Sequence, residues 1–237
     1  MTRLVLSGWP LQVGTLHIPK EAAHHARVNR VAVGEPVEVL NLVGQVGEGY
    51  LATWNPDGSC QVRVERVLAG RGEPPVPLVL ALAVLHTQAF DWAVEKATEL
   101  GATEIRPVLS ARVQGRHHQE RVRRWQRVAA AAVAQCGRSR CPQVLAPQEL
   151  KELLATAQGL RVVADPSGQG VESLRVLEPE AVVVLVGPEG GFTSAELDAI
   201  GRSGFQPLYL GPRTLRAETA AAAALSLVQA ALGWWTK

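Results

Sequence analysis

The feature that most constrains the fold is an apolar run followed directly by a glycine-rich loop and a helix start. Residues 181–186 read Ala-Val-Val-Val-Leu-Val, residues 187–192 read Gly-Pro-Glu-Gly-Gly-Phe, and Thr193 and Glu196 have the spacing of a capping box. We therefore expect a buried strand, a tight loop and a helix. Because glycine has no Cβ atom, a ligand can lie directly against the backbone of such a loop. The loop is a candidate binding site.

A second segment repeats this order about twenty residues later. Residues 208–210 read Leu-Tyr-Leu, residues 211–216 read Gly-Pro-Arg-Thr-Leu-Arg, and an alanine-rich stretch runs on to residue 232. We expect a strand, a Gly-Pro turn and a helix. Two such loops at the ends of neighbouring strands of an α/β sheet form a crevice where ligands bind. Glu189, Arg213 and Arg216 would lie on its rim.

The chain from residue 78 onward alternates apolar runs with helical patterns. This alternation predicts a mostly parallel α/β sheet with helices on both faces. Besides the two loop-bearing units, the expected strands are residues 78–85, 105–109, a short one near 144, and 160–164, and the expected helices are 88–100, 119–136 and 147–157.

The first seventy residues have a different rhythm. Short alternating stretches at residues 37–40, 49–54 and 61–65 are separated by turns rich in glycine and proline, which predicts a small antiparallel β-barrel. The segment 71–77, Arg-Gly-Glu-Pro-Pro-Val-Pro, reads as a linker. We therefore expect two domains, residues 1–70 and residues 74–237.

Composition narrows the functional classes. The 237 residues carry a net charge of +2, with no apolar run long enough to span a membrane and no signal layout at the N-terminus, so we expect a cytoplasmic protein. The three cysteines, Cys60, Cys136 and Cys141, lack metal-ligand spacing. We expect them to be reduced and structural, and we expect no metal site.

Positive charge is concentrated in two patches. The first patch lies on the expected helix 119–136 and just before it. Either a solvated helix face or contact with phosphate groups would explain this patch. Its members are Arg116, His117, His118, Arg121, Arg123, Arg124 and Arg127. The other lies near the N-terminus: Arg3, His24, His25, Arg27 and Arg30. For this second patch phosphate contact is favoured over metal binding, because no third metal ligand accompanies the adjacent histidines.

Several motifs in one order carry a family resemblance. They are residues 95–101 (Glu-Lys-Ala-Thr-Glu-Leu-Gly), Arg124-Trp125, residues 135–138 (Gln-Cys-Gly-Arg), the loop 187–192 with Glu196, and residues 210–220 (Leu-Gly-Pro-Arg-Thr-Leu-Arg-Ala-Glu-Thr-Ala). Together they resemble the ribosomal small-subunit RNA methyltransferase E family of the SPOUT superfamily.

The resemblance implies an architecture and an activity. It implies a C-terminal α/β domain with a trefoil knot, an exception to the rule that chains do not thread, and a PUA-like barrel at the N-terminus that helps to grip RNA. It also implies a homodimer that uses S-adenosylmethionine to methylate N3 of a uridine in 16S ribosomal RNA of the small subunit, at position 1498 in the usual numbering. The terminal tryptophans, Trp234 and Trp235, would suit a subunit interface.

The resemblance also assigns residues to the cofactor. The expected contacts come from the two loops, with Leu85 as a further candidate: Leu85, Val186, Gly187, Pro188, Glu189, Gly190, Gly191, Leu210, Gly211, Pro212 and Leu215. The chain departs from the family at two places. Family members often carry Lys and Arg where residues 86–90 of this chain read His-Thr-Gln-Ala-Phe, and they often carry Glu at the position of Ala134.

Methyl transfer to uridine N3 requires loss of the N3 proton. A carboxylate can accept it, or guanidinium groups can stabilise the charge that develops on the carbonyl oxygens. The catalytic candidates are Arg138, Glu189 and Arg216, although Glu189 could instead only brace its loop. The candidates for RNA contact are Arg3, His24, Arg27, Arg30, Arg123, Arg124 and Arg213.

Two other functions remain open from the sequence. The loop 187–192 could bind a nucleotide phosphate, although no P-loop or dinucleotide fingerprint is present. The chain could also be a non-catalytic RNA-binding protein, which would need no small-molecule crevice. Binding of S-adenosylmethionine distinguishes both from a methyltransferase.

Overall fold

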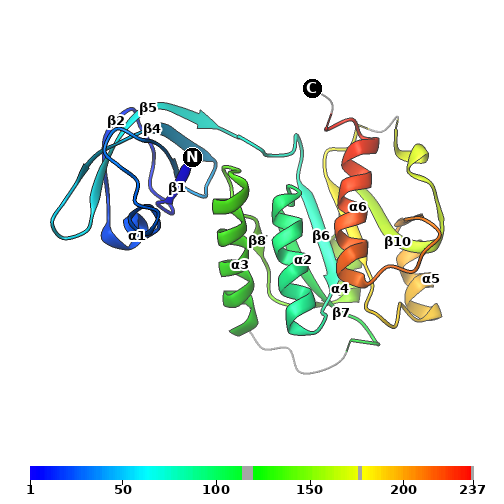
Figure 1. The fold of residues 1–237 in the computed structure, drawn as a ribbon. Helices are drawn as coiled ribbons and strands as arrows, with labels where there is room; N and C mark the ends of the chain where they lie inside the picture. The colour runs from blue at the N-terminus through cyan, green and yellow to red at the C-terminus, as the bar shows by residue number, and fades with distance from the viewer. Residues whose placement is uncertain (114–119, 176–177, 236–237) are drawn as a thin grey trace. The chain divides into compact units, whose positions relative to one another are not determined.

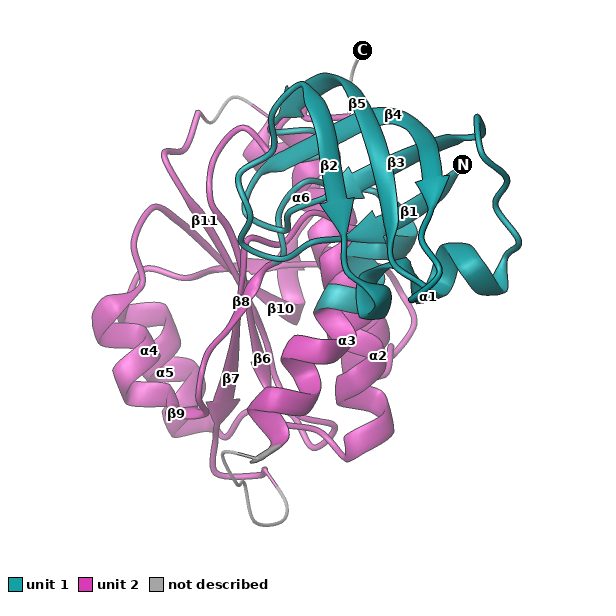
Figure 2. Ribbon diagram, turned by 90° about the vertical axis from the view of Figure 1, so that its left-hand side faces the viewer, with its two compact units in different colours: residues 1–73, 130–141 teal, residues 74–129, 142–237 magenta. Residues whose placement is uncertain are grey.

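The computed structural model describes residues 1–113, 120–175 and 178–235, which form two compact units. Unit 1 consists of Met1–Glu73 with Ala130–Cys141, and unit 2 consists of Pro74–Ala129 with Pro142–Lys237 (Figure 2). Within the described residues, no helix is both long and apolar enough to cross a membrane.

Unit 1 contains a five-stranded sheet in the order β1-β3-β4-β5-β2. Its elements are β1 (Thr2–Val5), β2 (Gly14–Ile18), α1 (Lys20–Val28), β3 (Pro36–Leu40), β4 (Gln45–Trp54) and β5 (Cys60–Ala69). Three strand pairs are antiparallel, but β1 runs parallel to β3, with Thr2 opposite Val37. The fully antiparallel arrangement predicted from the sequence is therefore wrong for this pair, because alternation along one strand does not show the direction of its neighbour.

One core joins every element of this sheet. The cluster includes Leu4 of β1, Ile18 of β2, Val39 of β3 and Val62 of β5, with Ala23 and its neighbours from α1. Since all five strands and the helix share one core, the sheet must curve around it. Full burial of one such leucine or valine side chain is worth about 1.5–3 kcal/mol.

The C-terminal part of α3 (Glu120–Cys136) belongs to unit 1. Val133 packs with Leu40, Leu42 and Val46, and the Arg3 guanidinium donates to the carbonyl oxygen of Ala134 at 3.2 Å. The last carbonyls of a helix have no partner within it, so this arginine satisfies one of them.

The second domain expected from the sequence, residues 74–237, therefore includes a segment that packs elsewhere. Arg71 donates to the carbonyl oxygen of Gly137 at 2.8 Å, and Arg138 pairs with Glu73 at 2.5 Å. The break falls at Glu73 and Pro74, inside the predicted linker, but residues 130–141 lie with unit 1. The sequence did not predict this because the apolar stripe of the helix continues without interruption across Ala129.

Unit 2 contains a parallel sheet in the order β12-β10-β11-β6-β7-β8, with β9 paired to β7. The mostly parallel α/β fold predicted from the sequence is confirmed. Its strands are β6 (Leu78–Ala83), β7 (Glu104–Leu109), β8 (Gln143–Val144), β9 (Gln148–Glu149), β10 (Leu160–Gln169), β11 (Val182–Val186) and β12 (Gln206–Leu208). The helices are α2 (Thr87–Glu99), the first part of α3, α4 (Leu150–Thr156), the short η1 (Val171–Leu174), α5 (Ser194–Arg202) and α6 (Ala217–Ala231).

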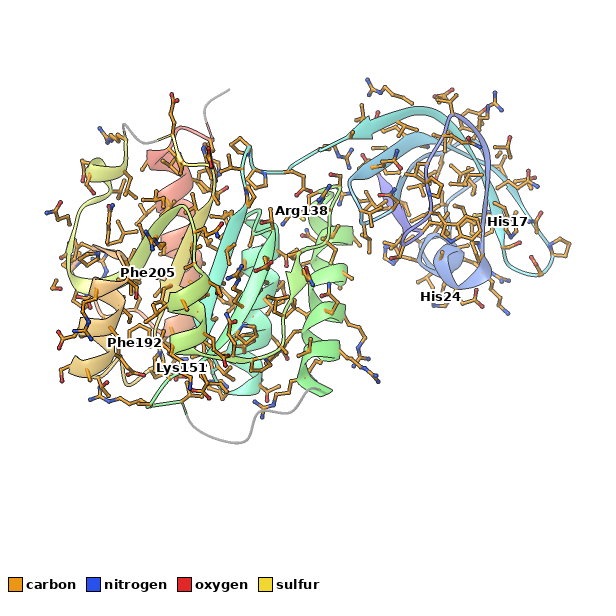
Figure 3. All side chains as sticks on the ribbon, turned by 180° about the vertical axis from the view of Figure 1, so that it is seen from behind. His17, His24, Arg138, Lys151, Phe192 and Phe205 are labelled. Atoms are coloured by element: carbon orange, nitrogen blue, oxygen red, sulfur yellow. The ribbon has the colours of Figure 1, made fainter. Side chains whose placement is uncertain are left out.

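Helices cover both faces of this sheet (Figures 1 and 2). On one face α4 and α5 pack through Leu153, Ile200 and nearby Phe205 onto strand residues such as Leu185. Figure 3 shows Phe192 and Phe205 on this side. On the other face α6 packs against α2 and against β6, β10 and β11.

Candidate functional site

A cavity of about 420 Å³ lies at the carboxyl ends of three adjacent strands of unit 2. The lining comes from residues of β10 directly after its last pair with β11 (Val163 opposite Leu185), from the end of β11 and the loop after it, from the loop after β12, and from α5 and α6. This volume and position are typical of small-molecule sites in α/β proteins. The lining residues are Ala164–Pro166, Val186–Glu189, Gly191, Phe192, Leu197, Tyr209–Leu215, Ala217 and Ala220.

The order of the strands differs from the expectation of two loops on neighbouring strands. β10 lies between β11 and β12, so the two glycine-containing loops flank a third wall formed by Ala164, Asp165 and Pro166. The sequence did not predict this wall. The available signal was the sequence Asp-Pro-Ser-Gly at residues 165–168, directly after an apolar run, which the structure places inside β10.

The loop after β11 keeps its shape through its own backbone. The N–H of Gly191 donates to the carbonyl oxygen of Pro188 at 2.8 Å, and Gly191 has φ +69°, a conformation that favours glycine. Gly187 is needed for space, because a Cβ atom there would lie 2.9 Å from the Phe192 ring. Gly190 was expected at the cofactor but does not line the cavity, and a Cβ atom there would point towards Arg112, 3.3 Å from its Cδ.

The loop after β12 has backbone donors to offer. Within the described residues, no backbone N–H between Leu210 and Arg216 donates to a protein acceptor. Gly211, with φ +110°, again has a conformation suited to glycine. Backbone N–H groups need a partner when they are removed from water, so these groups can donate hydrogen bonds to acceptor atoms of a ligand.

Helix α5 begins with the capping box predicted from the sequence. The hydroxyl of Thr193 accepts from the N–H of Glu196 at 3.2 Å, and the Glu196 carboxylate accepts from the N–H of Thr193 at 2.8 Å. The other carboxylate oxygen accepts from the N–H of Ala111 at 2.8 Å. Burial acts to raise the pKa of Glu196, but the hydrogen bonds from Thr193 and Ala111 outweigh it and lower the pKa.

Three charged side chains line the cavity: Asp165, Glu189 and Arg213. One oxygen of Asp165 accepts from the N–H and the hydroxyl of Ser167, at 2.7 and 2.5 Å, which fixes the orientation of the carboxylate. Glu189 and Arg213 are exposed. The site can therefore meet both positive charge on a ligand and negative charge that develops on a substrate.

Three other predicted residues lie outside the lining. Leu85 is buried, with 2% of its surface exposed, and Arg216 is exposed at the N-cap of α6. Arg138 belongs to unit 1, where its guanidinium is buried and paired with Glu73 (Figure 3). The ion pair with Glu73 fixes the Arg138 guanidinium within unit 1.

The expected RNA contacts fall into two groups. His24, Arg27 and Arg30 are exposed on or just after α1, and Arg123 is exposed on α3. Others are already engaged: Arg3 pairs with Glu38 at 2.9 Å, and Arg124 pairs with Asp91 at 2.6 Å. The remaining candidates Arg116, His117 and His118 lie outside the described residues. In the part of the chain that is described, no three His, Cys, Asp or Glu side chains are placed to hold a metal ion.

Comparisons with known proteins show the family of this chain. A family model for an RNA methyltransferase domain matches residues 72–229. The chain is 30% identical over 238 residues to the ribosomal RNA small subunit methyltransferase E of Synechocystis sp., covering 97% of this chain and 78% of that protein. It is 32% identical over 178 residues to the protein of the same name from Mesomycoplasma hyopneumoniae, covering 73% and 78%.

A solved structure shares the whole fold. The crystal structure of ribosomal RNA small subunit methyltransferase E from Neisseria gonorrhoeae, bound to S-adenosyl methionine, matches with a TM-score of 0.87 and 29% identity, covering 97% of both chains. The fold and the matched domain thus define an RNA methyltransferase. More specifically, the chain belongs to the ribosomal RNA small subunit methyltransferase E family.

Proposed function

We propose that this protein transfers a methyl group from S-adenosylmethionine to N3 of a uridine in 16S ribosomal RNA of the small subunit, at position 1498 in the usual numbering. The observation that carries the proposal is the cavity at the ends of β10, β11 and β12, built from the loops that the matched RNA methyltransferase domain includes. Family membership favours this activity over a nucleotide-phosphate enzyme or a non-catalytic RNA-binding protein.

The cavity fits the chemistry of this cofactor. Its lining is largely apolar, as the adenine ring and the methionine chain require, and the open backbone N–H groups between Leu210 and Arg216 match the hydrogen-bond acceptors of adenine. S-Adenosylmethionine carries a sulfonium and an ammonium group, which favour the nearby carboxylates of Asp165 and Glu189. When bound, it supplies an electrophilic methyl group.

The residues of this chain would orient the uracil ring and accept the proton that N3 loses. In this proposal the exposed carboxylate of Glu189 accepts the N3 proton, and the Arg213 guanidinium stabilises the charge that develops on a uracil carbonyl oxygen. Arg213 takes this role ahead of Arg216 because it lines the cavity. Arg216 and Arg138 remain predicted contributors without a place in the lining.

The proposal also includes the architecture of the family. Unit 2 would be the trefoil-knotted domain, and unit 1 would be a PUA-like domain that binds RNA through His24, Arg27 and Arg30.

The proposal also includes the oligomeric state of the family: two chains would form a homodimer. Trp235, of which 55% is exposed near the end of α6, supports a contact with a second copy. Light scattering at micromolar concentration should report twice the mass of one chain, and a monomer would contradict the dimer.

Mapping the methylated nucleotide tests the central claim. Small ribosomal subunits that lack the modification are incubated with the protein and S-adenosylmethionine, and the 16S RNA is then analysed by nuclease digestion and mass spectrometry. We expect one new N3-methyluridine at position 1498. Methylation at another base, or none with protein that binds the cofactor, would contradict the proposal. Parallel reactions with naked 16S RNA show whether the assembled particle is required.

A further inference from the structure

Two long-range hydrogen bonds join the segment after β7 to the loop after β11 and to the first turn of α5. Glu196 accepts from the N–H of Ala111 at 2.8 Å, and Arg112 donates to the carbonyl oxygen of Gly190 at 2.5 Å. In the sheet, β6 lies between β7 and β11. The two bonds therefore connect loops that their own strands do not bring into contact.

Glu196 does more than cap its helix. One of its carboxylate oxygens accepts from the N–H and the hydroxyl of Thr193, at 2.8 and 3.0 Å, which completes the cap. The other oxygen is used for Ala111, 85 residues away in the sequence. Helix capping alone does not require this second bond.

Arg112 covers the outer side of the loop. A Cβ atom at Gly190 would lie 3.3 Å from Cδ of Arg112, whereas Gly187, Pro188, Glu189 and Gly191 line the cavity on the inner side. The loop is thus held between the Arg112 side chain and the space for the ligand. Any displacement of Gly190 would move the residues that line the cavity.

We propose that Arg112 and Glu196 are positioning residues that hold the loop 187–191 in its binding conformation. Neither side chain lines the cavity. Arg112 acts on the loop through the carbonyl oxygen of Gly190, and Glu196 acts by fixing Ala111, the residue next to Arg112. A loop that is already ordered loses less conformational entropy when ligand binds, which raises affinity. Because linkage is reciprocal, ligand binding should also order the segment at Ala111. This inference rests on S-adenosylmethionine as the ligand of the proposed function.

The test compares cofactor affinity among variants of the full chain. Calorimetry with S-adenosylmethionine should show about 10-fold weaker binding for Arg112→Ala and for Glu196→Ala, since each loses one long-range bond. Arg112→Lys keeps a donor and should recover part of the affinity. Arg202→Ala is the matched control, because this arginine is exposed at the end of α5 and is not in the cavity lining.

A second control separates positioning from helix stability. Thr193→Val removes the capping hydroxyl but leaves the N–H of Ala111 bonded to Glu196, so it should lower thermal stability without the affinity loss of Glu196→Ala. Hydrogen exchange supplies a readout that stability alone would not move. In the wild type, S-adenosylmethionine should slow exchange at Ala111, and in Glu196→Ala, which has no acceptor for this N–H, the protection should be lost.

The outcomes are distinct. If the wild type binds the cofactor and both Arg112→Ala and Glu196→Ala bind it equally well, the positioning role is wrong while the proposed function stands. Equal losses for Thr193→Val and Glu196→Ala would assign the effect to the helix cap and overturn the inference. A wild type that binds no S-adenosylmethionine would contradict the proposed function, and the inference would fall with it.

Discussion

At the scale of single residues, the site depends on an absent side chain at Gly187. A Cβ atom there would lie 2.9 Å from Cε2 and 3.1 Å from Cδ2 of Phe192, both closer than ordinary van der Waals contact. Phe192 itself lines the cavity. A substitution at Gly187 therefore moves a wall of the site rather than only the loop.

Gly187→Ala should weaken binding of S-adenosylmethionine by about 10-fold or more, because the ring of Phe192 must shift and overpacking typically costs about 1–3 kcal/mol. Gly201→Ala is the control. A Cβ atom at Gly201 meets nothing within 4 Å, and alanine is favoured over glycine inside a helix such as α5. Calorimetry on both variants checks this, and equal affinities would show that Phe192 does not shape the cofactor site.

Glu189 gives the residue-scale prediction for chemistry. If its carboxylate accepts the N3 proton, Glu189→Gln should lower kcat by about 100-fold or more while cofactor affinity changes little. Asp198→Asn, an exposed carboxylate of α5 outside the cavity lining, should leave both unchanged. Single-turnover methylation and calorimetry separate the two quantities. A parallel loss of affinity and rate would make Glu189 a loop brace or a binding residue.

At the scale of elements, a buried carboxylate joins three segments of unit 1. Glu38 of β3 is 3% exposed and pairs with Arg71 at 2.5 Å and with Arg3 at 2.9 Å. Both arginines also donate to carbonyl oxygens at the end of α3. The position of that helix end therefore depends on one ionised carboxyl group.

This arrangement predicts a dependence of stability on pH. The Arg71 guanidinium, together with Arg3, holds the pKa of Glu38 below its usual value, although burial acts in the opposite direction. A carboxyl group with a lower pKa in the folded state stabilises the fold above its unfolded pKa. That contribution is lost as pH falls through the folded pKa.

Urea midpoints measured from pH 7 down to pH 3 should therefore fall more steeply for the wild type than for Glu38→Gln. The variant should be less stable at pH 7, since its arginines lose their partner. Glu21→Gln, at an exposed position in the first turn of α1, should reproduce the wild-type curve. Parallel curves for Glu38→Gln and the wild type would show that Glu38 is not the responsible group.

The elements show how far the sequence predicts this fold. β6 and β11 are buried at every residue, so their unbroken apolar runs identified them. Helix α1 was not predicted, because its buried side is made only of small residues such as Ala23 and Ala26. β10 extends to Gln169, past the expected end at Ala164, because Gln169 pairs with Leu208 of β12 despite the turn residues between.

Some parts of the candidate site could be predicted from the sequence and others could not. The two glycine-containing loops were recognisable from their composition, and they supply most of the cavity lining. The wall at Asp165 depends on the order of the strands, which no local pattern records. The brace at Arg112 depends on contacts between distant loops, so only the folded chain reveals it.

At the scale of the whole molecule, experiments can test whether unit 1 binds RNA while unit 2 binds the cofactor. A truncated chain starting near Pro74 is unsuitable for this test, because residues 130–141 belong to unit 1. Removal of residues 1–73 would leave Arg138 without Glu73 and Val133 without its core. Point substitutions on the surface of unit 1 test the RNA grip without this damage.

The exposed arginines of unit 1 should determine how RNA binding depends on salt. Arg27 and Arg30 lie on or next to the exposed side of α1, whereas Arg3 is engaged with Glu38. If the two exposed arginines neutralise phosphates, the double variant Arg27→Gln and Arg30→Gln should bind RNA more weakly. The slope of log affinity against log salt should also become shallower, by about 0.7 for each phosphate of a single strand that the variant no longer neutralises.

Fluorescence anisotropy with a labelled 16S RNA fragment, over about 50–300 mM KCl, measures this slope. Arg202→Gln, an exposed arginine of unit 2, is the charge-matched control for a single substitution. Arg3→Gln should instead lower stability, because it leaves Glu38 with one partner fewer and removes a bond to the end of α3. The salt dependence reports phosphate contacts rather than base contacts. If the slope is unchanged in the double variant but shallower in Arg123→Gln, the phosphate contacts are made by α3 and not by α1.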